Sequence, residues 1–332
     1  MILLDETKAK AFLLQHGITN SDIKKIAGDA SFRSYYRIFE SGKEDKILMF
    51  APPGHEDVRP FIKIDEVLQR YNFSAPKIYA VDRGNGFMLL EDFGDDSYSR
   101  VLAKLDGDEL KKREFELYQN ACNCLLELGM TAAANDNDLL PYNNSRLFNE
   151  VMLFIDWYLR LKNVALSAVQ KADYKNMWFK LFDRLSDNRK VLVLRDYHAD
   201  NLLLVRDRKG IHSVGLLDFQ DALVGSAAYD LVSLLEDARR DLVEENRQKL
   251  LECYLKGYSG NKDGFLRDYA ILSLQRNIKI LGIFARLSLR DNKHAYLNLL
   301  PRVVNFVKLR LNSSKKNMFT EVGLTDFLMQ YL

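Results

Sequence analysis

The 332-residue sequence has few of the features that mark specialised protein classes. Its three cysteines, Cys122, Cys124 and Cys253, are too few and too unevenly spaced for a disulfide framework or a zinc site. No run of eighteen apolar residues occurs, so the sequence predicts no membrane-spanning helix. The 48 lysines and arginines nearly balance the 46 aspartates and glutamates, and a net charge of +2 gives no support for a nucleic-acid partner.

Other absences concern the amino terminus and the regularity of the chain. The first ten residues, MILLDETKAK, contain neither the basic region nor the apolar stretch of a secretory signal. Only six prolines are present, and there is no internal repeat or low-complexity tract. With 47% hydrophobic and 28% charged residues, the sequence predicts a soluble cytoplasmic protein built as one two-lobed unit or two domains.

The most informative stretch is residues 191–221, where short apolar runs alternate with carboxylates. The runs Val191–Leu194 and Leu202–Val205 enclose a polar turn, and a third run, Val214–Leu217, ends at Asp218. Such runs are typical of short buried strands. A hairpin with Gly210 at its tip would return the third strand to the second, so the pattern predicts a site where this hairpin ends.

Three side chains of this stretch, Asp196, Asn201 and Asp218, meet the needs of one reaction. Activation of a hydroxyl requires a carboxylate within hydrogen-bond reach of its proton. Mg²⁺ prefers oxygen ligands, which an amide and a second carboxylate supply. The four residues between Asp196 and Asn201 can turn so that both face one cleft. An Asp and Asn pair at this spacing is common by chance, but a third carboxylate directly after an aliphatic run favours a functional site.

These motifs resemble a known enzyme family. The segments DYHADN at residues 196–201, DFQD at 218–221 and the Tyr-Asp pair at 229–230 resemble the catalytic segment of the aminoglycoside phosphotransferase family, whose members have a protein-kinase-like fold. Within that family, GDASFRSYYRI, APPG and LRDYHADN resemble bacterial sugar kinases that phosphorylate N-acetylmuramate and N-acetylglucosamine at the anomeric hydroxyl. The resemblance extends over residues 25–310.

The resemblance implies a bilobal α+β fold with a small antiparallel-sheet lobe and a larger, mainly helical lobe. Residues 1–92 would form the nucleotide-binding lobe, and residues 93–332 the helical lobe with the catalytic loop and the substrate pocket. The implied ligands are ATP, Mg²⁺ and an amino sugar. Asp196 would be the catalytic residue that accepts or orients the hydroxyl proton, and Asn201 and Asp218 would hold the metal ion.

The nucleotide is expected to bind to the first lobe. Residues 28–33 are the candidate for a loop that covers the phosphates, because they precede the first expected strand, although they contain a single glycine. The adenine is expected to meet the backbone at residues 91–93, where the lobes would join. The candidate nucleotide-binding residues are therefore Ser31, Phe32, Arg33, Arg37, Glu91 and Phe93.

One residue that the resemblance implies is missing. Kinase-like folds commonly carry a lysine on the third strand that holds the phosphates and pairs with a glutamate of the next helix. Here that strand is Lys46–Phe50, and the expected position is closer to Met49 than to Lys46. Arg33 or Arg37 is the candidate replacement cation, and Glu66 a candidate partner for it.

Four further residues are candidates for contact with the substrate, namely Arg195, His198, Asp221 and Trp157. Each also has a structural alternative, since a histidine in a loop often bonds that loop and an aromatic residue at helical spacing is more often part of a core. Asp230 is expected to anchor the catalytic loop by backbone hydrogen bonds, because a buried carboxylate persists only when it is well bonded.

Hydrophobic periodicity predicts the other elements. The first ninety residues should form a helix at 5–16, a hairpin of 34–39 and 46–51, a helix at 57–70 and two strands at 77–81 and 87–90. Beyond residue 107, apart from residues 191–221, the pattern predicts helices at 108–128, 144–161, 167–186, 226–238, 241–258, 264–287, 291–311 and 319–331.

The sequence thus predicts an ATP-dependent kinase of an amino-sugar hydroxyl, acting in cell-wall recycling, with no nucleic-acid, membrane or protein partner inferred. Kinases of an aminoglycoside, choline or a homoserine-like alcohol remain alternatives, since they would share these motifs. A non-catalytic nucleotide-binding regulator would explain the missing lysine. A metal-dependent hydrolase using Asp196, His198, Asp200 and Asp218 is a third alternative.

Overall fold

The computed structural model describes residues 4–19, 21–26, 32–131, 133–135, 139–186, 190–312 and 318–332. The chain forms two compact units, the first from residues 1–101 and 200–221 and the second from residues 102–199 and 222–332. The segment 200–221 therefore packs with the amino-terminal hundred residues, although it lies far along the chain. The two units are defined by which residues pack together. The lobe boundary expected between residues 92 and 93 stays a prediction.

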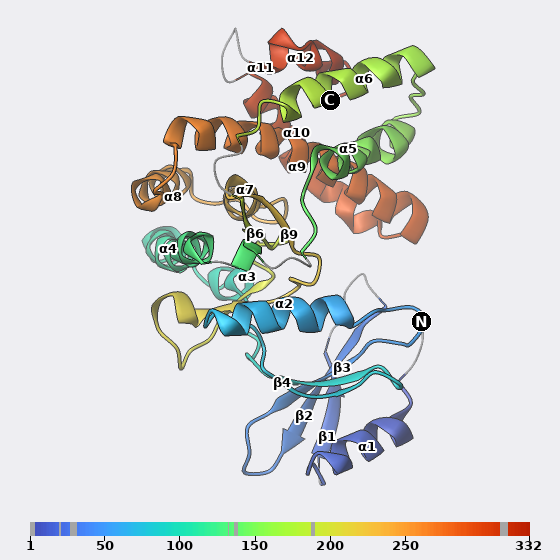
Figure 1. The fold of residues 1–332 in the computed structure, drawn as a ribbon, viewed down its shortest axis with the longest axis vertical. Coiled ribbons are helices and arrows are strands. Elements are labelled where there is room, and N and C mark those ends of the chain that lie inside the picture. Colours follow the sequence, from blue (N-terminus) through green and yellow to red (C-terminus); the bar gives the residue numbers. More distant parts are fainter. Residues whose placement is uncertain are drawn as a thin grey trace. The chain divides into compact units, whose positions relative to one another are not determined.

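The first unit is organised around a five-stranded antiparallel sheet of order β1-β2-β3-β5-β4 (Figure 1). Its strands are β1 (Ser21–Lys25), β2 (Ser34–Glu40), β3 (Lys46–Phe50), β4 (Ile78–Asp82) and β5 (Phe87–Glu91). The two expected hairpins are confirmed, and β1, which the sequence analysis missed, is added at the edge. Its sequence SDIKK is polar and only partly buried, so it lacks the apolar signal of an interior strand.

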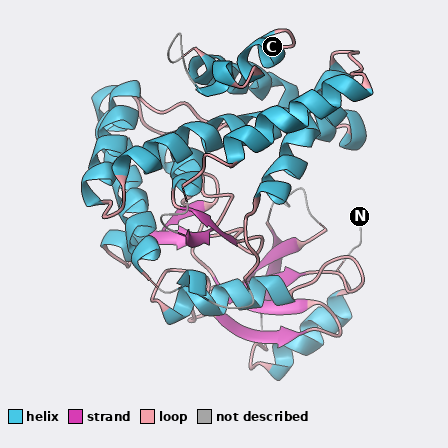
Figure 2. Cartoon of the chain, turned by 45° about the horizontal axis from the view of Figure 1, so that its top comes forward, coloured by secondary structure: helices cyan, strands magenta, loops and turns pink. Residues whose placement is uncertain are grey.

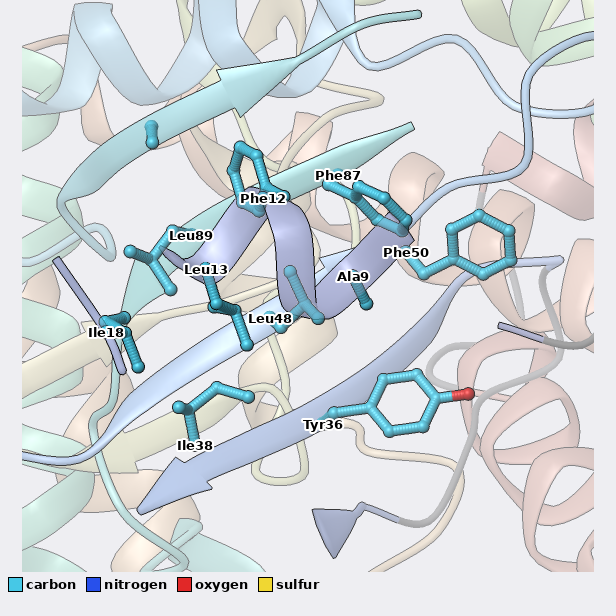
Figure 3. Packing of buried hydrophobic residues seen from close by; sticks show 11 residues of the cluster. Ala9, Phe12, Leu13, Ile18, Tyr36, Ile38, Leu48, Phe50, Phe87 and Leu89 are labelled. Atoms are coloured by element: carbon cyan, nitrogen blue, oxygen red, sulfur yellow. The ribbon is translucent and has the colours of Figure 1, made fainter. Parts of the chain in front are cut away.

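Helix α1 (Glu6–Gln15) packs its apolar face on this sheet, as expected from its spacing. Figure 3 shows Ala9, Phe12 and Leu13 of the helix among side chains of the strands, including Phe87 and Leu89. The rings of Phe12 and Phe87 lie 5.6 Å apart between centroids. This burial offsets the weak intrinsic stability of a ten-residue helix.

Helix α2 (Arg59–Arg70) is strongly amphipathic and buries Phe61, Ile64, Val67 and Leu68. The ring of Phe61 packs against that of Phe219, with centroids 4.9 Å apart. Because Phe219 follows Asp218 in the chain, this contact ties the end of segment 200–221 to the amino-terminal part of the unit.

Strands β7 (Leu202–Leu204) and β8 (Val214–Leu216) form the expected antiparallel hairpin, with Leu202 opposite Leu216. A short 3-10 helix at Gly210–Ser213 completes the turn. Gly215 permits a close approach, because a Cβ atom there would lie 2.9 Å from the ring of Phe93. A larger residue would push the hairpin away from the segment that follows β5.

The second unit is mainly helical, and long helices make up most of it in Figure 2. Its helices of eight or more residues are α4 (Gly107–Met130), α5 (Asn144–Leu153), α6 (Ala168–Phe182), α7 (Ala228–Leu235), α8 (Glu244–Gly257), α9 (Lys262–Asp291) and α10 (Leu300–Leu311). Leu102, the last residue of helix α3 (Tyr98–Leu102), is the first residue of this unit. The short helices α11 (Met318–Glu321) and α12 (Leu324–Met329) lie at its carboxyl end. Within the described part of the chain, no helix is long and apolar enough to cross a membrane.

Most expected helices are present, but the one expected at 226–238 is shorter. Residues Leu223–Ser226 form strand β9, which pairs antiparallel with β6 (Lys190–Val193), and only Ala228–Leu235 is helical, as α7. Residues 222–235 are mostly apolar on both sides of Ser226, so periodicity did not separate strand from helix. The expected helix 144–161 continues beyond α5 as a π-helical turn at Phe154–Leu159.

Candidate active site

Asn201 and Asp218 lie at the same end of the β7–β8 hairpin. The backbone N–H of Leu217 donates to the carbonyl oxygen of Asn201 at 3.0 Å, which holds the two positions together. Both side chains line one cavity of ≈ 470 Å³ within the first unit. Asp218 has φ 57°, in the left-handed region that a non-glycine residue rarely adopts. Backbone strain of this kind is retained most often at functional sites.

The cavity combines an apolar wall with an acidic one. The apolar side chains that line it include Ile47, Phe61, Leu90, Leu203 and Leu217. The charged residues of its lining are Glu91, Asp92, Asp95, Asp200 and Asp218 against Arg37 and Arg100. Apolar walls with a few polar groups suit a flat heterocyclic base. A polyanionic group would be repelled by this excess of carboxylates unless it arrived with cations.

Arg37 of β2 is held by two carboxylates of the segment that follows β5. Its Nη1 donates to Asp95 at 2.6 Å, and its Nη2 donates to Asp92 at 3.1 Å, while Nε also donates to Asp92. The hydrogen bond that Arg37 donates to Asp95 is the main cause of the raised pKa of Arg37. The positive charge is therefore matched within the cavity wall, so Arg37 is a poor replacement for a lysine that binds phosphates. Its part in nucleotide binding stays a prediction.

Arg33 is the candidate cation that lies beside the proposed metal ligand. Its Nη2 is 3.5 Å from Asp218 Oδ1, and its Nε is 3.8 Å from Glu56 Oε2. Burial disfavours the charged guanidinium, but the charges of Tyr35, Asp218 and Glu56 outweigh it and raise the pKa of Arg33. Arg33 therefore stays cationic beside Asp218.

The rest of the expected phosphate loop is only partly described. Ser31 and residues 27–30 lie outside the described residues. Phe32 is 58% exposed, its backbone N–H donates to Glu56 at 3.1 Å, and its ring packs on His55 with centroids 5.3 Å apart. An exposed aromatic ring at this point offers a contact for a ligand, but nothing in the structure assigns one.

Glu91 and Phe93 both line the cavity, as candidates for contact with the base should. Glu91 ends β5, and its carboxylate accepts hydrogen bonds from Arg208 and from the backbone N–H of Lys77, the latter at 3.1 Å. The guanidinium of Arg208 lies over the ring of Phe93, 5.2 Å from its centroid. These contacts fix the segment after β5, whose role at the adenine stays a prediction.

The strand position expected for a lysine is occupied by an apolar side chain. Met49 is fully buried, and the ammonium of Lys46 instead lies over the ring of Tyr79, 5.4 Å from its centroid. Glu66 is exposed on α2, whereas its neighbour Asp65 is 3% exposed. Burial raises the pKa of Asp65 to about 7, with the charges of Glu66 and Glu91 adding to it. Met49 carries no charge, so it cannot form the expected ion pair with Glu66.

Asp196 lies in the second unit, at a tightly held turn after β6. Arg195, the residue before it, has φ 72°, again in the left-handed region. The carboxylate of Asp230 on α7 accepts hydrogen bonds from the backbone N–H groups of Leu194 at 2.6 Å and Arg195 at 2.8 Å. Asp230 therefore holds the backbone immediately before Asp196, the contact expected of an anchor for this loop.

The charges around Asp196 keep it ionised. Burial raises the pKa of its carboxyl group, but electrostatic interactions with Lys279, His198 and Arg276, together with Arg195, more than offset this and lower it. An ionised carboxylate accepts a hydrogen bond from a hydroxyl without first losing a proton. Asp196 is thus prepared for the role that the sequence suggests.

A polar cluster around Glu150 lies next to this turn and was not recognised from the sequence. Glu150 of α5 accepts hydrogen bonds from Arg195 Nη2 at 2.6 Å, from Lys279 Nζ at 3.0 Å and from Gln275 Nε2 at 2.9 Å, and also from the Tyr142 hydroxyl. Burial would raise the pKa of Glu150, but Lys279 and Arg195 lower it to about 2. The cluster therefore fixes Arg195, the neighbour of Asp196.

A signal for this cluster was present in the sequence. The α9 segment ILSLQRNIKILGIF, residues 271–284, places Gln275, Arg276, Asn277 and Lys279 among aliphatic residues. All four side chains are buried. Polar residues inside an apolar helix must be bonded to something, so the pattern favours an interior network or a ligand site.

The other substrate candidates have mixed surroundings. His198 is 4% exposed and bonded to Arg239, with Nε2 3.3 Å from Arg239 Nη1, and burial lowers its pKa. Trp157 is half-buried under the guanidinium of Arg160, 5.7 Å from its ring centroid. Asp221 is exposed in the first unit. His198 is packed as a structural residue would be, and contact of any of the three with substrate stays a prediction.

The structure brings Asn201 and Asp218 together, and it brings Asp230, Arg195 and Asp196 together. The first pair belongs to the first unit and the second group to the second unit. The convergence of Asp196 with Asn201 and Asp218 therefore stays a prediction from their spacing.

Comparisons with known proteins agree with the sequence motifs. Residues 22–270 match the model of the phosphotransferase enzyme family. An N-acetylmuramate/N-acetylglucosamine kinase of Caulobacter vibrioides is 31% identical, with 90% of each chain covered. An enzyme of the same name from Pseudomonas aeruginosa is 35% identical over 87% of this chain and 83% of its own.

Solved structures share the fold at much lower identity. A choline/ethanolamine kinase family protein from Mesorhizobium loti superposes with a TM-score of 0.64 at 12% identity, covering 98% of this chain and 100% of its own. The ADP-bound aminoglycoside phosphotransferase APH(2'')-Ib superposes with a TM-score of 0.59 at 15% identity, covering 92% and 99%. The expected bilobal, protein-kinase-like α+β fold is thereby confirmed.

Proposed function

Because the chain belongs to the phosphotransferase enzyme family, and is therefore an enzyme that transfers a phosphoryl group to a hydroxyl, we propose that it phosphorylates N-acetylmuramate and N-acetylglucosamine with ATP. The observation that carries the proposal is the agreement between the LRDYHADN and DFQD motifs and relatives of that name over 80% or more of both chains. In the described residues, no group of three or more His, Cys, Asp or Glu side chains is placed to hold a metal, so the hydrolase alternative gains no support.

The reaction assigned to these residues is direct phosphoryl transfer. The substrate hydroxyl oxygen forms a bond to the γ-phosphorus of ATP as the bond from that phosphorus to the bridging oxygen breaks and ADP leaves. Asp196 orients the hydroxyl and accepts its proton. Its lowered pKa supports this role, since the carboxylate is ready to accept at neutral pH.

The cavity of the first unit is the proposed site of ATP. Its apolar side chains would contact the adenine, with the backbone at Glu91–Phe93 beside it. Arg33 would supply positive charge for the phosphates in place of the missing lysine, because it stays charged and lies beside Asp218. Residues 28–33 would cover the phosphates.

Asn201 and Asp218 fit the needs of Mg²⁺. The donor set of one amide and one carboxylate is typical of Mg²⁺ sites, which use few protein ligands and complete their coordination with phosphates and water. The excess of carboxylates in the cavity also calls for an added cation when phosphates bind. When bound, the metal ion would supply charge that stabilises the transferred phosphoryl group.

The test is ADP release from ATP with N-acetylmuramate, N-acetylglucosamine, kanamycin and choline, each with and without Mg²⁺. We expect turnover with the two acetylated sugars only, and only with Mg²⁺. Asp196→Asn should lose turnover while retaining ATP binding, because the substitution keeps the shape and removes the proton acceptor. Near-normal turnover of Asp196→Asn would overturn the role of Asp196, and turnover of choline or kanamycin alone would overturn the substrate.

A further inference from the structure

Arg276 of α9 is a buried arginine with no partner among the described residues. Its side chain is 4% exposed, and its Nη1 atom is buried without a hydrogen bond. No hydrogen bond or ion pair joins it to any other residue that the structure describes. Guanidinium groups stay charged at all ordinary pH values, so this is a buried positive charge without a bonded counterion.

The carboxylates near Arg276 are committed elsewhere. The two on which its charge acts are Asp196, the proposed proton acceptor, and Asp230. Both oxygens of Asp230 accept backbone N–H groups. Arg276 therefore has negative charges near it, but no carboxylate is hydrogen-bonded to it among the residues that the structure describes.

The contrast with other buried cations of the same unit is clear. Lys279, one turn further along α9, has Glu150 at 3.0 Å, and Arg240, whose side chain is 16% exposed, donates to the fully buried Glu114. Buried charges are normally paired in this way, because removing a charge from water is costly unless hydrogen bonds replace the water. An exception therefore calls for a partner that the isolated chain does not contain.

Arg276 also lies close enough to the proposed catalytic residue to act on it. Its charge is one of those that lower the pKa of Asp196, after Lys279 and His198. Burial raises the pKa of Asp230 to about 7, and the charge of Arg276 opposes that rise. Residues 276 and 279 lie on the same face of α9, and Lys279 is joined through Glu150 to Arg195, the residue before Asp196. A ligand bonded to Arg276 would therefore lie near the reacting hydroxyl.

We propose that Arg276 binds the carboxylate of an acidic amino sugar and thereby sets the preference of the enzyme for N-acetylmuramate over N-acetylglucosamine. This inference rests on the proposed function, because it assigns a residue to one of its two substrates. The two sugars differ in the lactyl ether of N-acetylmuramate, which ends in a carboxylate. A guanidinium matches a carboxylate with two parallel N–H donors, which an ammonium does not.

The experiment compares kcat/KM for both sugars in the wild type, Arg276→Met and Arg276→Lys. Loss of a charge-assisted hydrogen bond should lower kcat/KM for N-acetylmuramate roughly 10- to 100-fold, mainly through KM. For N-acetylglucosamine, which has no carboxylate, the loss should be roughly threefold or more smaller than for N-acetylmuramate, because only the effect of Arg276 on Asp196 remains and Lys279 and Arg195 still lower the pKa of that residue. Arg276→Lys should recover part of the loss, since it keeps the charge but not the paired donors.

Arg286→Met is the matched control. It removes a half-buried arginine from the same helix, ten residues and about 15 Å further along its axis. We expect it to leave the ratio of the two kcat/KM values unchanged. Thermal melting of all variants identifies folding defects, and Arg276→Gln replaces Arg276→Met if the apolar substitution unfolds the protein.

Each result decides the inference. An equal loss for both sugars would show that Arg276 only supports Asp196, and no loss for either would show that it is not used, so both results would overturn the proposal. Calorimetric binding of the two sugars gives a readout that does not need turnover. Binding of N-acetylmuramate that is lost in Arg276→Met, without turnover in the wild type, would keep the carboxylate site but overturn the proposed kinase function. Absence of both binding and turnover would overturn both.

Discussion

The cavity of the first unit and the surroundings of Asp196 in the second unit have opposite charge balances. Five carboxylates line the cavity against two guanidinium groups, and Arg37 is already matched by two of those carboxylates. Around Asp196, three permanent cations, Arg195, Arg276 and Lys279, stand beside Glu150. The first region would need cations from outside if it binds phosphates, whereas the second supplies cations around the carboxylate of Asp196. This difference is what the proposed function requires, a metal–nucleotide complex in the first region and an ionised carboxylate in the second.

Removing Asp218, the proposed metal ligand in the cavity of the first unit (the acidic region), should have the largest effect on turnover. We expect Asp218→Ala to lower kcat by about 10³-fold, the scale observed when one electrostatic group of an active site is lost. The measurement is steady-state turnover across a Mg²⁺ titration. Asp207→Ala, an exposed carboxylate in the turn of the same hairpin, should leave turnover unchanged. If both variants lost activity equally, the loss would follow from the change in net negative charge and not from the removal of a specific metal ligand.

Removing Glu150, the carboxylate that binds Arg195 and Lys279 in the surroundings of Asp196, should have the largest effect on stability. Glu150→Ala leaves Arg195 and Lys279 buried without their shared partner, and we expect the free energy of unfolding to fall by about 3–5 kcal/mol. Urea denaturation measures this change. Glu116→Ala, whose ion pair with Arg113 is exposed, is the control and should change stability by less than about 0.5 kcal/mol. Similar losses in the two variants would remove the distinction between the buried cluster and a surface pair.

Removing the paired arginine of the acidic region should have an intermediate effect. Arg37→Met leaves Asp92, whose side chain is 7% exposed, without its cation. We expect a loss of about 1–3 kcal/mol of stability and a several-fold rise in the KM for ATP, because the cavity wall becomes more negative. Arg59→Met, which breaks the exposed pair with Asp57, should change neither quantity. An unchanged KM for ATP would separate Arg37 from nucleotide binding.

The smallest expected effect is a pH dependence of stability that originates at Asp65 of α2, whose pKa is affected by Glu91 of the cavity lining. The pKa of Asp65 is raised by burial to about 7, above its value of about 3.9 in an unfolded chain. The folded protein therefore binds this proton more tightly, so the stabilising contribution is complete below about pH 4 and is lost as the pH rises to about 7. Asp65→Asn should be more stable than the wild type by roughly 1–3 kcal/mol at pH 8 and nearly equal to it at pH 4. Parallel pH profiles of the two proteins in urea denaturation would contradict the assignment.

Local features of the sequence were sufficient for most of the fold. The apolar spacing of α1 and α2, the two strands expected at 77–81 and 87–90 and the aliphatic runs of the β7–β8 hairpin each depend on near neighbours, and each was predicted correctly. The failures were β1 and β9. Strand β1 has a polar sequence, and β9 continues directly into an apolar helix, so in both cases pairing with a distant strand decided the structure.

Some residues of the candidate site could likewise be predicted from local sequence, and others could not. Asp196, Asn201 and Asp218 stood out because their chemistry and spacing are visible along the chain, and Asp230 because a buried carboxylate needs donors. The partners of Arg37 lie more than fifty residues away, at Asp92 and Asp95. No local pattern indicates such a pairing.

The sequence by itself determined the class of this protein, because family motifs and hydrophobic periodicity are short-range properties that can be read along the chain. Only the tertiary structure decided which charges are matched. It pairs Glu150 of α5 with Lys279 of α9, 129 residues later, and leaves Arg276, three residues before that lysine, without a bonded carboxylate. The physical reason is that the cost of a buried charge depends on the groups within a few ångströms of it, and folding brings those groups together from distant parts of the chain.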